Sequence, residues 1–288
     1  MPAGGRPTVR SRRLGAALKR HRLAAGMDQA GAAEVIKAST TRVSRIEGGQ
    51  VSARALEVDR LLMAYGVEDE GERRRLDALA RVANQRGWWQ DYGDVVRPGY
   101  ADHISLENDA TAMRVWHPSL MPGLLQTPAY AEAVISAGPH QIPDDRVSEL
   151  TKVREERQKK IEEGGATFAA VIWEPVIHAL ASGGDVGIEQ LRYVLEVMRR
   201  KNVTVQLLPL KEEKMAGSSG PFTAFSFGPE PIIEAVTLNT LTSNAVLEDP
   251  DDLGVYLAGF DALRSVAMGP DQTASVIREV IRTKEVES

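Results

Sequence analysis

The sequence predicts an α+β multidomain chain with an all-helical amino-terminal domain and a carboxy-terminal α/β domain whose mixed sheet is flanked by helices. Three observations carry this prediction. Residues 11–86 repeat apolar side chains at helical spacing between capping residues and glycines. From Thr167 onward, short strand-like segments flank an amphipathic helix. Basic residues gather in the first 50 positions, whereas the remainder of the chain is acidic.

Length and composition bound the class of protein. The 288 residues are enough for two hydrophobic cores, and 43% hydrophobic with 26% charged residues is typical of a folded chain. The absence of cysteine excludes disulfides, thiol catalysis and cysteine-ligated zinc. No apolar run approaches the roughly 20 residues that span a bilayer, and the Arg-rich amino terminus lacks the apolar segment of a secretory signal. We therefore expect a cytoplasmic protein without a membrane partner.

The net charge of −5 hides a strong asymmetry. Residues 1–50 contain ten Lys/Arg and three Asp/Glu, a charge of +7, whereas the remainder contains 25 basic and 37 acidic residues, a charge of −12. A basic end is the electrostatic footprint of phosphate binding, and an acidic remainder would be repelled by a nucleic acid. Residues 1–10 are rich in Pro, Gly and Arg, and we expect a disordered basic arm there.

The stretch from Met27 to Gly49 predicts two short helices joined by a tight turn, at residues 28–36 and 40–47. Asp28 and Ser39 are placed to cap them. In the second helix, Val43 and Ile46 share one face. Small hydroxyls and an arginine, which suit the major groove of DNA, lie on or near the opposite face: Thr40, Thr41, Ser44 and Arg45. Two core helices of an ordinary bundle are the alternative, and the flanking positive charge favours the DNA interpretation.

This stretch resembles the helix-turn-helix (HTH) of phage-repressor-like (Xre-type) transcriptional regulators. The resemblance rests on Gln29, Ala32, Ala33, Ser39, Val43, Ile46, Glu47 and Gly48. It implies a five-helix, repressor-like DNA-binding domain over residues 11–86. One position departs from the pattern. The turn usually holds glycine where this chain has Lys37, and a left-handed non-glycine residue costs roughly 1 kcal/mol.

The resemblance also implies roles for individual residues. Gln29 would contact a phosphate, and Arg22 would form a structural ion pair with Glu47. Thr40, Thr41 and Arg45 would face bases. Together with the basic surface of the first helix, the predicted DNA-binding residues are Arg12, Arg13, Gln29, Ser39, Thr40, Thr41, Arg42, Ser44 and Arg45.

The other helices of this domain follow from caps and apolar spacing. Ser11 is the expected cap of a helix that runs to about Ala25, with a buried stripe of Leu14, Leu18 and Leu23. Ser52 is the expected cap of a fourth helix, with buried Leu56, Leu61, Leu62 and Tyr65. A fifth helix should span residues 70–86.

The carboxy-terminal domain is expected at residues 87–288, beginning with the aromatic cluster of Trp88, Trp89 and Tyr92. Its predicted helices are residues 105–115, 143–163, 188–198, 250–267 and 270–284. Its predicted strands are residues 167–174, 203–208, 222–227 and 232–238, the last two forming a hairpin.

Segments of this domain resemble the carboxy-terminal domain of antitoxin-like regulators of high-GC filamentous bacteria. They are LMPGLLQTPAYAEAV, the strand that ends at Trp173-Glu174, NVTVQLLPL and GPFTAFSF. The resemblance implies a domain that docks a small acidic partner protein. Because one small HTH domain binds DNA weakly, we also expect a homodimer that places two HTH copies on a palindromic operator. The alternative is a sensor of a small molecule or peptide. Its candidate partner- or ligand-binding residues are Trp88, Trp89, Leu125, Gln126 and Tyr130.

Motifs for catalysis are weak. The five histidines include no pair at the spacing of a helical metal site, and neither a G-x-S-x-G elbow nor a phosphate loop is present. Glu107 and Glu174 are candidates for paired carboxylates, but solvated or salt-bridged carboxylates are the favoured interpretation. We therefore predict a regulator that is not an enzyme and has no metal or cofactor.

Overall fold

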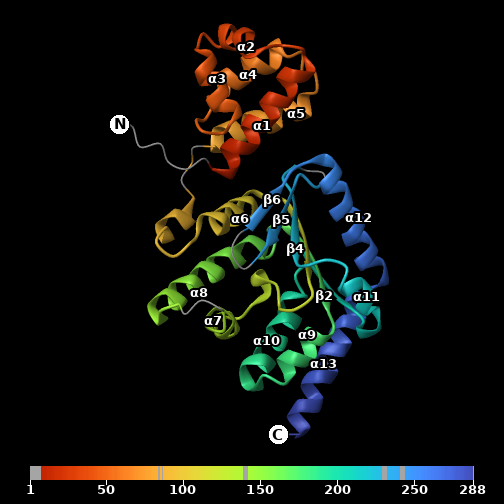
Figure 1. Cartoon of the computed structure of the whole chain (residues 1–288). Helices are drawn as coiled ribbons and strands as arrows, with labels where there is room; N and C mark the ends of the chain where they lie inside the picture. Colours follow the sequence, from red (N-terminus) through yellow and green to blue (C-terminus); the bar gives the residue numbers. More distant parts are fainter. Residues whose placement is uncertain are drawn as a thin grey trace. The chain divides into compact units, whose positions relative to one another are not determined.

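The computed structural model describes residues 8–83, 85, 87–138, 142–228, 232–240 and 244–287 (Figure 1). The chain divides into two compact units, Met1–Trp88 and Trp89–Ser288. The amino-terminal unit is helical, and the carboxy-terminal unit contains a mixed six-stranded sheet with flanking helices. The predicted fold class is therefore confirmed.

The α-helices of the amino-terminal unit have local sequence causes. Asp28 caps α2 by accepting a hydrogen bond from the backbone N–H of Gly31, and Ser39 caps α3 by accepting from Arg42. Both caps are as predicted. Lys37, in the turn between these helices, has a φ of 53°, the left-handed conformation for which glycine is the usual residue. The five helices are α1 (Val9–Ala24), α2 (Gln29–Val35), α3 (Thr40–Glu47), α4 (Ala55–Ala64) and α5 (Glu70–Val82).

Helix α1 begins earlier than predicted. Thr8 caps it by accepting from the backbone N–H of Ser11, while the Ser11 hydroxyl donates to the carbonyl of Gly49 at 2.8 Å. Val9 and Arg10 therefore belong to a helix and not to the predicted disordered arm of residues 1–10, of which residues 1–7 lie outside the described residues. Arg10 is buried, and its guanidinium donates to the carbonyl of Val82.

Three other local predictions are wrong. The N-cap of α4 is Arg54, whose backbone N–H donates to Glu57, and not Ser52. Helix α5 ends at Val82, before the predicted residue 86. Leu23 and Leu56, expected in the core, are 59% and 61% exposed. Each lies five positions from a buried leucine of its own helix, which rotates it about 140° away from the buried stripe.

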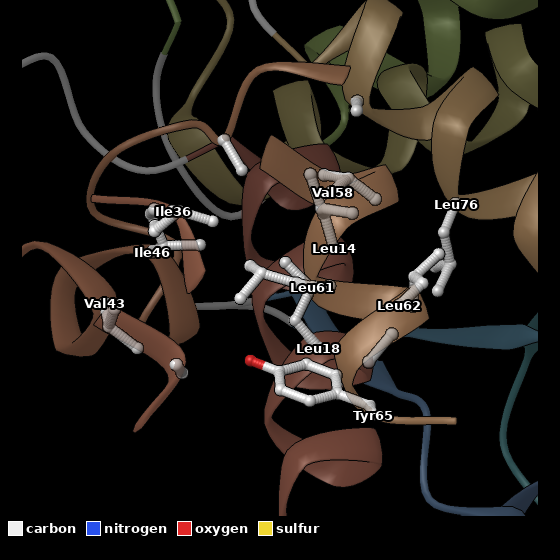
Figure 2. Close-up of a cluster of buried hydrophobic side chains, with 14 of the residues drawn as sticks. Leu14, Leu18, Ile36, Val43, Ile46, Val58, Leu61, Leu62, Tyr65 and Leu76 are labelled. Carbon is white, nitrogen blue, oxygen red and sulfur yellow. The ribbon is translucent and has the colours of Figure 1, made fainter. Parts of the chain in front are cut away.

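The core of the amino-terminal unit joins all five helices (Figure 2). Within this core, the backbone of α1 at Gly15 directly approaches the backbone at the end of α3. A Cβ atom on Gly15 of α1 would lie 2.2 Å from the carbonyl oxygen of Ile46 and 2.7 Å from that of Glu47. Glycine at this position therefore lets α1 touch the carboxyl end of α3. The labelled core residues in Figure 2 are Leu14, Leu18, Ile36, Val43, Ile46, Val58, Leu61, Leu62, Tyr65 and Leu76.

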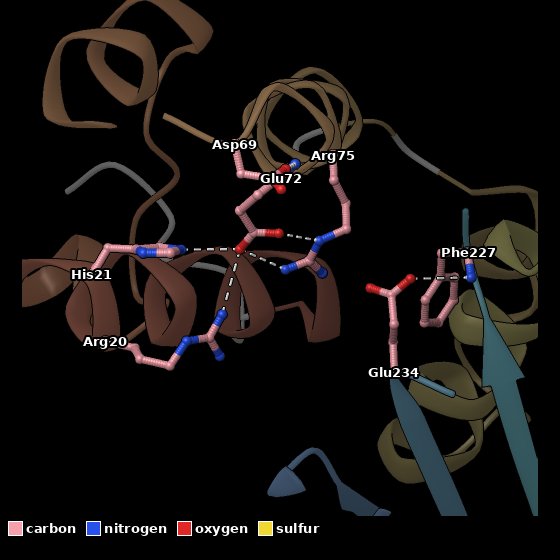
Figure 3. A network of polar contacts seen from close by, with 7 residues as sticks. All are labelled: Arg20, His21, Asp69, Glu72, Arg75, Phe227 and Glu234. Atoms are coloured by element: carbon pink, nitrogen blue, oxygen red, sulfur yellow. Dashed lines mark hydrogen bonds and ion pairs between the residues drawn. The ribbon is translucent and has the colours of Figure 1, made fainter. Parts of the chain in front are cut away.

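A polar cluster ties α5 to α1 on the surface of this unit (Figure 3). The carboxylate of Glu72 accepts from His21 at 3.0 Å, from Arg20 at 3.4 Å and from Arg75 at 2.7 Å. Burial would raise the pKa of Glu72, but Arg75 and His21 outweigh it and lower the pKa to about 2. Asp69 caps α5 beside this cluster by accepting from the backbone N–H of Glu72.

The sheet of the carboxy-terminal unit has the strand order β3-β2-β1-β4-β5-β6. β1, β2 and β3 are parallel neighbours, and β4, β5 and β6 continue the sheet antiparallel. The strands are β1 (Ala112–His117), β2 (Thr167–Trp173), β3 (Val203–Leu208), β4 (Phe222–Ser226), β5 (Ala235–Asn239) and β6 (Asn244–Leu247).

Strand β1 replaces the second half of the helix predicted at residues 105–115. The helix lies earlier, as α6 (Pro98–Asp109), and β1 is the central strand, paired with both β2 and β4. Strand pairing with partners more than 50 residues away decides this segment, and local spacing cannot show it. β4 and β5 form the predicted antiparallel pair, and β6 was not predicted. Before β5, the Glu234 carboxylate accepts from the backbone N–H of Phe227 (Figure 3).

The two faces of this sheet are covered by different helices (Figure 1). Phe260 of α12 packs in one cluster with Trp116 and Phe222, on one face. Alternation along β1 turns Met113 and Val115 to the other face, where α6 and α8 lie. The remaining helices are α7 (Pro128–Ser136), α8 (Asp144–Gln158), α9 (Pro175–Ala181), α10 (Gly184–Val197), α11 (Glu213–Ala216), α12 (Pro250–Val266) and α13 (Pro270–Glu287). Within the described ranges, none of these helices has the length and apolarity to cross a membrane.

The Gly15 contact predicts a destabilising substitution. Gly15→Ala should lower the free energy of unfolding by about 1–3 kcal/mol, because the new methyl group meets backbone atoms of α3 that cannot rotate away. The matched control is Gly31→Ala in α2, whose Cβ meets the flexible side chain of Met27. This control should be neutral or stabilising by up to about 1 kcal/mol. Urea unfolding followed by circular dichroism checks both, and equal effects of the two substitutions would contradict the packing argument.

Candidate nucleic-acid interface

Helix α3 presents two different faces. Val43 and Ile46 are each 2% exposed and belong to the core of the amino-terminal unit. The opposite side of the helix carries side chains that are all exposed: Thr40, Thr41, Ser44 and Arg45. Three short hydroxyl side chains and one guanidinium therefore stand outward on a helix with a packed inner face. An exposed helix surface of this kind can enter the major groove and offer hydrogen-bond donors and acceptors to base edges.

The two arginines of α3 differ in how their charge is compensated. Arg42 is partly buried, and its Nη2 donates to both carboxylate oxygens of Glu57, at 2.9 and 3.0 Å. This contact holds Arg42 against the start of α4. Arg45 is exposed, and no carboxylate of the described part of the chain forms an ion pair with it. Arg45 is therefore the arginine of α3 whose charge is available to a ligand.

A buried ion pair connects α1 to the end of α3. Nε of Arg22 donates to Glu47 at 2.5 Å and Nη2 donates to the other carboxylate oxygen at 3.0 Å. Nη1 of Arg22 donates to the carbonyl of Met27 at 2.7 Å. Burial would raise the pKa of Glu47, but hydrogen bonds from Arg22 and Gln29 outweigh it and lower this pKa. The structure thus brings together the two residues that the resemblance to Xre-type regulators assigned to an ion pair.

Gln29 joins this cluster at the first residue of α2. Its Nε2 donates to Glu47 at 3.0 Å, and its side chain is only partly exposed. A side-chain amide carries two N–H donors. The contact with Glu47 therefore orients the amide at the amino end of α2 and leaves capacity for a second acceptor.

The basic surface of α1 is smaller than predicted. Arg13 is only 8% exposed, because it is four residues from both Val9 and Ala17 and so lies on the buried stripe of the helix. The prediction that Arg13 is exposed is therefore wrong, and its contact with DNA stays a prediction. Arg12 is partly exposed, and Lys19 and Arg20 are exposed.

Sequence reasoning missed the residues that support these side chains. Glu57 holds Arg42, and Gly15 and Gly49 permit the close approach of α1 to the end of α3. A Cβ atom on Gly49 would lie 2.6 Å from the Cα of Arg12. Of these supporting residues, only Glu57 could have been predicted from the sequence, because it lies in the first turn of α4, where a carboxylate is typical.

The binding role of the five candidate partner- or ligand-binding residues stays a prediction. The division of the chain falls between Trp88 and Trp89. Leu125 is buried, Tyr130 is partly buried, and Gln126 is buried with its amide donating to the carbonyl of Met121. Of the five, Gln126 alone lines the cavity that the structure describes in the carboxy-terminal unit.

The two carboxylates weighed for catalysis have structural partners. Glu107 is buried and its carboxylate accepts from Arg157 at 2.7 Å, whereas Glu174 accepts from the backbone N–H of Leu210 at 2.7 Å. Among the residues that the structure places, no group of three His, Asp or Glu side chains has the arrangement of a metal site.

Comparison with protein families agrees with this geometry. A family model described as a helix-turn-helix domain matches residues 13–76, which include α2, α3 and the turn between them. The amino-terminal unit is therefore an HTH domain, and the match supports a regulator that binds DNA. A second family model, described as a domain of unknown function (DUF5753), matches residues 100–279. The chain belongs to this family. Curated proteins and solved structures contain no match to the chain.

The buried ion pair predicts strongly unequal effects of single and double substitutions. Arg22→Met should lower the free energy of unfolding by about 3–5 kcal/mol, because it leaves the Glu47 carboxylate buried without its cation. The double variant Arg22→Met with Glu47→Leu should recover most of that loss, since neither charge remains. A double-mutant cycle in urea measures both values. Additive losses would contradict a direct interaction between the two groups.

Proposed function

We propose that the protein is a sequence-specific transcriptional regulator that reads DNA with α3. The observation that carries this proposal is the outward face of α3, where Thr40, Thr41, Ser44 and Arg45 are exposed over a packed core. The +7 charge of residues 1–50 supplies the sequence-independent attraction to phosphates. The match to the HTH family supports the same class of function.

The proposed contacts divide into base readout and phosphate contacts. Arg45 reads a guanine, because an unpaired guanidinium can donate to O6 and N7 together. Thr40 and Thr41 approach neighbouring base edges, with Ser39 and Ser44 at the groove edge. Gln29 and Arg12 contact phosphates, with the Gln29 amide oriented by Glu47. Arg42 stabilises α3 through Glu57 and acts near the backbone.

We also propose a homodimer on a palindromic operator. One small HTH domain makes few base contacts, and two copies bound to half-sites about one helical turn apart combine theirs. The dimerisation and partner contacts are assigned to the carboxy-terminal unit, because its negative charge disfavours a place on DNA.

For the docking of a small acidic partner protein, the supporting features are the resemblance to antitoxin-like regulators and the edge of the sheet. β6 ends the strand order and, within the described residues, pairs with β5 alone. An edge strand offers backbone groups for addition of a partner strand. Residues 51–288 carry a net charge of −12, so an acidic partner would bind through such backbone pairing or apolar contacts and not through general charge attraction.

Arg45 provides the test of DNA reading. Arg45→Ala should weaken binding to the selected operator by roughly 1–3 kcal/mol and relax the preference at one base position. The matched control is Lys19→Ala, which removes one exposed charge from α1 and should weaken binding to all sequences similarly. Operators are first selected from random DNA, and affinities are then measured by fluorescence anisotropy at one fixed salt concentration. Unchanged specificity in Arg45→Ala would rule out the role of α3 proposed for this residue.

The homodimer is tested separately by sedimentation velocity. At micromolar concentration with the selected operator, the complex should contain two chains per duplex, and an operator cut to one half-site should bind one chain far more weakly. A single chain per intact operator, with no loss of affinity on the half-site, would contradict the dimer and leave the α3 assignment untouched.

A further inference from the structure

The carboxy-terminal unit contains a cavity of about 150 Å³ between the sheet and helices α6 and α8. It lies on the sheet face opposite α12, where Met113, Val115 and His117 of β1 point. The segment after β1, which includes Met121 and Leu124, forms a further wall. An apolar cavity of this volume can hold a benzene-sized molecule.

The wall of the cavity combines an apolar part with a few convergent polar groups, which is the composition of a ligand site. The apolar part includes Met113, Val115, Leu124, Val134 and Phe168. The charged and polar part includes His103, Glu107, His117, Gln126, Arg154 and Arg157.

One of the two arginines of this cavity is fully compensated. Arg157 donates to both carboxylate oxygens of Glu107, through Nε at 2.8 Å and through Nη2 at 2.7 Å. Its Nη1 donates to the hydroxyl of Tyr100 at 2.6 Å. Burial would raise the pKa of Glu107, but the charge of Arg157 outweighs it and holds this pKa well below its usual range. Arg157 and Glu107 therefore form a neutral pair that is part of the architecture.

The second arginine, Arg154, has no such partner. Its Nη1 donates to the side-chain oxygen of Gln126, a neutral acceptor. The amide of Gln126 is oriented by donating to the carbonyl of Met121 at 2.7 Å. Among the residues that the structure describes, no carboxylate forms an ion pair with Arg154. Burial lowers the pKa of Arg154, and the neighbouring charge of Arg157 lowers it further, whereas the interaction with Tyr100 opposes both.

His117 adds a neutral donor to the same wall. Its Nδ1 accepts from the backbone N–H of Leu120 at 3.1 Å, so in the neutral ring the proton is on Nε2. Burial, with a contribution from the charge of Arg154, lowers the pKa of His117 to about 4. The ring is therefore uncharged at neutral pH, and of the two arginines that line the cavity Arg154 is the one without a carboxylate partner among the described residues.

We propose that this cavity binds a small monocarboxylic acid with an apolar body, whose carboxylate pairs with Arg154 and whose body lies against Met113 and Phe168. A planar carboxylate matches the fork of a guanidinium, and one negative charge balances the single unpaired cation. Phosphate carries more than one negative charge, and among the described residues the wall holds no second unpaired arginine to balance it. This proposal goes beyond the function proposed above and does not depend on DNA binding.

The experiment uses the full chain and benzoate as the probe, with binding followed by isothermal titration calorimetry and by ligand-detected nuclear magnetic resonance. Benzoate should bind with one site per chain. Benzamide, its neutral isostere, should bind at least 10-fold more weakly, because it cannot pair with Arg154. Acetate, which has the charge but little apolar surface, should also bind at least 10-fold more weakly than benzoate.

Three variants locate the site. Arg154→Met should weaken benzoate binding at least 10-fold and leave benzamide binding nearly unchanged. Lys152→Met, which removes an exposed charge from the same helix, should bind benzoate as the natural chain does. Val134→Phe narrows the cavity and keeps Arg154, so it should weaken both probes. Thermal unfolding of each variant shows that it is folded.

Several outcomes would overturn the proposal. The proposal fails if benzoate does not bind at millimolar concentration, or if benzoate and benzamide bind with equal affinity. It also fails if folded Arg154→Met binds benzoate as tightly as the natural chain does. Binding of acetate as tight as that of benzoate would also overturn it, because the site would then be a simple anion site. Because none of these measurements includes DNA, their failure would leave the proposed DNA-binding function standing, and a failed operator selection would leave this proposal standing.

Discussion

The ion pair between Arg22 and Glu47 is the interaction on which the outward face of α3 depends. It joins α1 to the last residue of α3, and the same two side chains also bind the Met27 carbonyl and the Gln29 amide at the start of α2. One buried pair of charges thus contacts all three of these helices and fixes their positions relative to one another. Because both groups are desolvated, removing either partner alone is costly, whereas replacing both with packed apolar residues is often neutral. The close approach at Gly15 works with it, since a larger residue would move α3 away from α1.

Five arginines of the two units illustrate one physical rule. Arg22, Arg42 and Arg157 each meet a carboxylate at hydrogen-bond distance, so their charges are satisfied within the fold and act as architecture. Arg45 and Arg154 have no carboxylate partner among the described residues, one on an exposed helix face and the other in a cavity wall. A negatively charged ligand gains the most binding free energy where it pairs with a cation that has no partner within the fold. The rule separates supporting residues from candidate ligand contacts without reference to any relative.

The cavity and the outward face of α3 belong to different units, and each has its own physical argument. A ligand held in the carboxy-terminal unit can affect DNA binding only if it has different affinity for the DNA-competent and incompetent states of the chain. The same condition applies to a partner strand added at β6. The docking and sensing interpretations therefore address different features of the unit, a sheet edge and a cavity, and they do not exclude each other.

By itself, the sequence determined the HTH segment and most of the elements, because caps, turns and helical spacing are local. Asp28 and Ser39 showed the positions of α2 and α3 by their capping role, and the turn between them was predicted although Lys37 stands where glycine is usual. Tertiary structure alone decided β1, the burial of Arg13 and the charge balance of the cavity. Whether an arginine is paired depends on residues about 25 positions away for Arg22 and 50 for Arg157, and Arg154 shares the charged helix α8 with Arg157. Local pattern shows which side chains are charged, and only the folded chain shows which of those charges already have a partner.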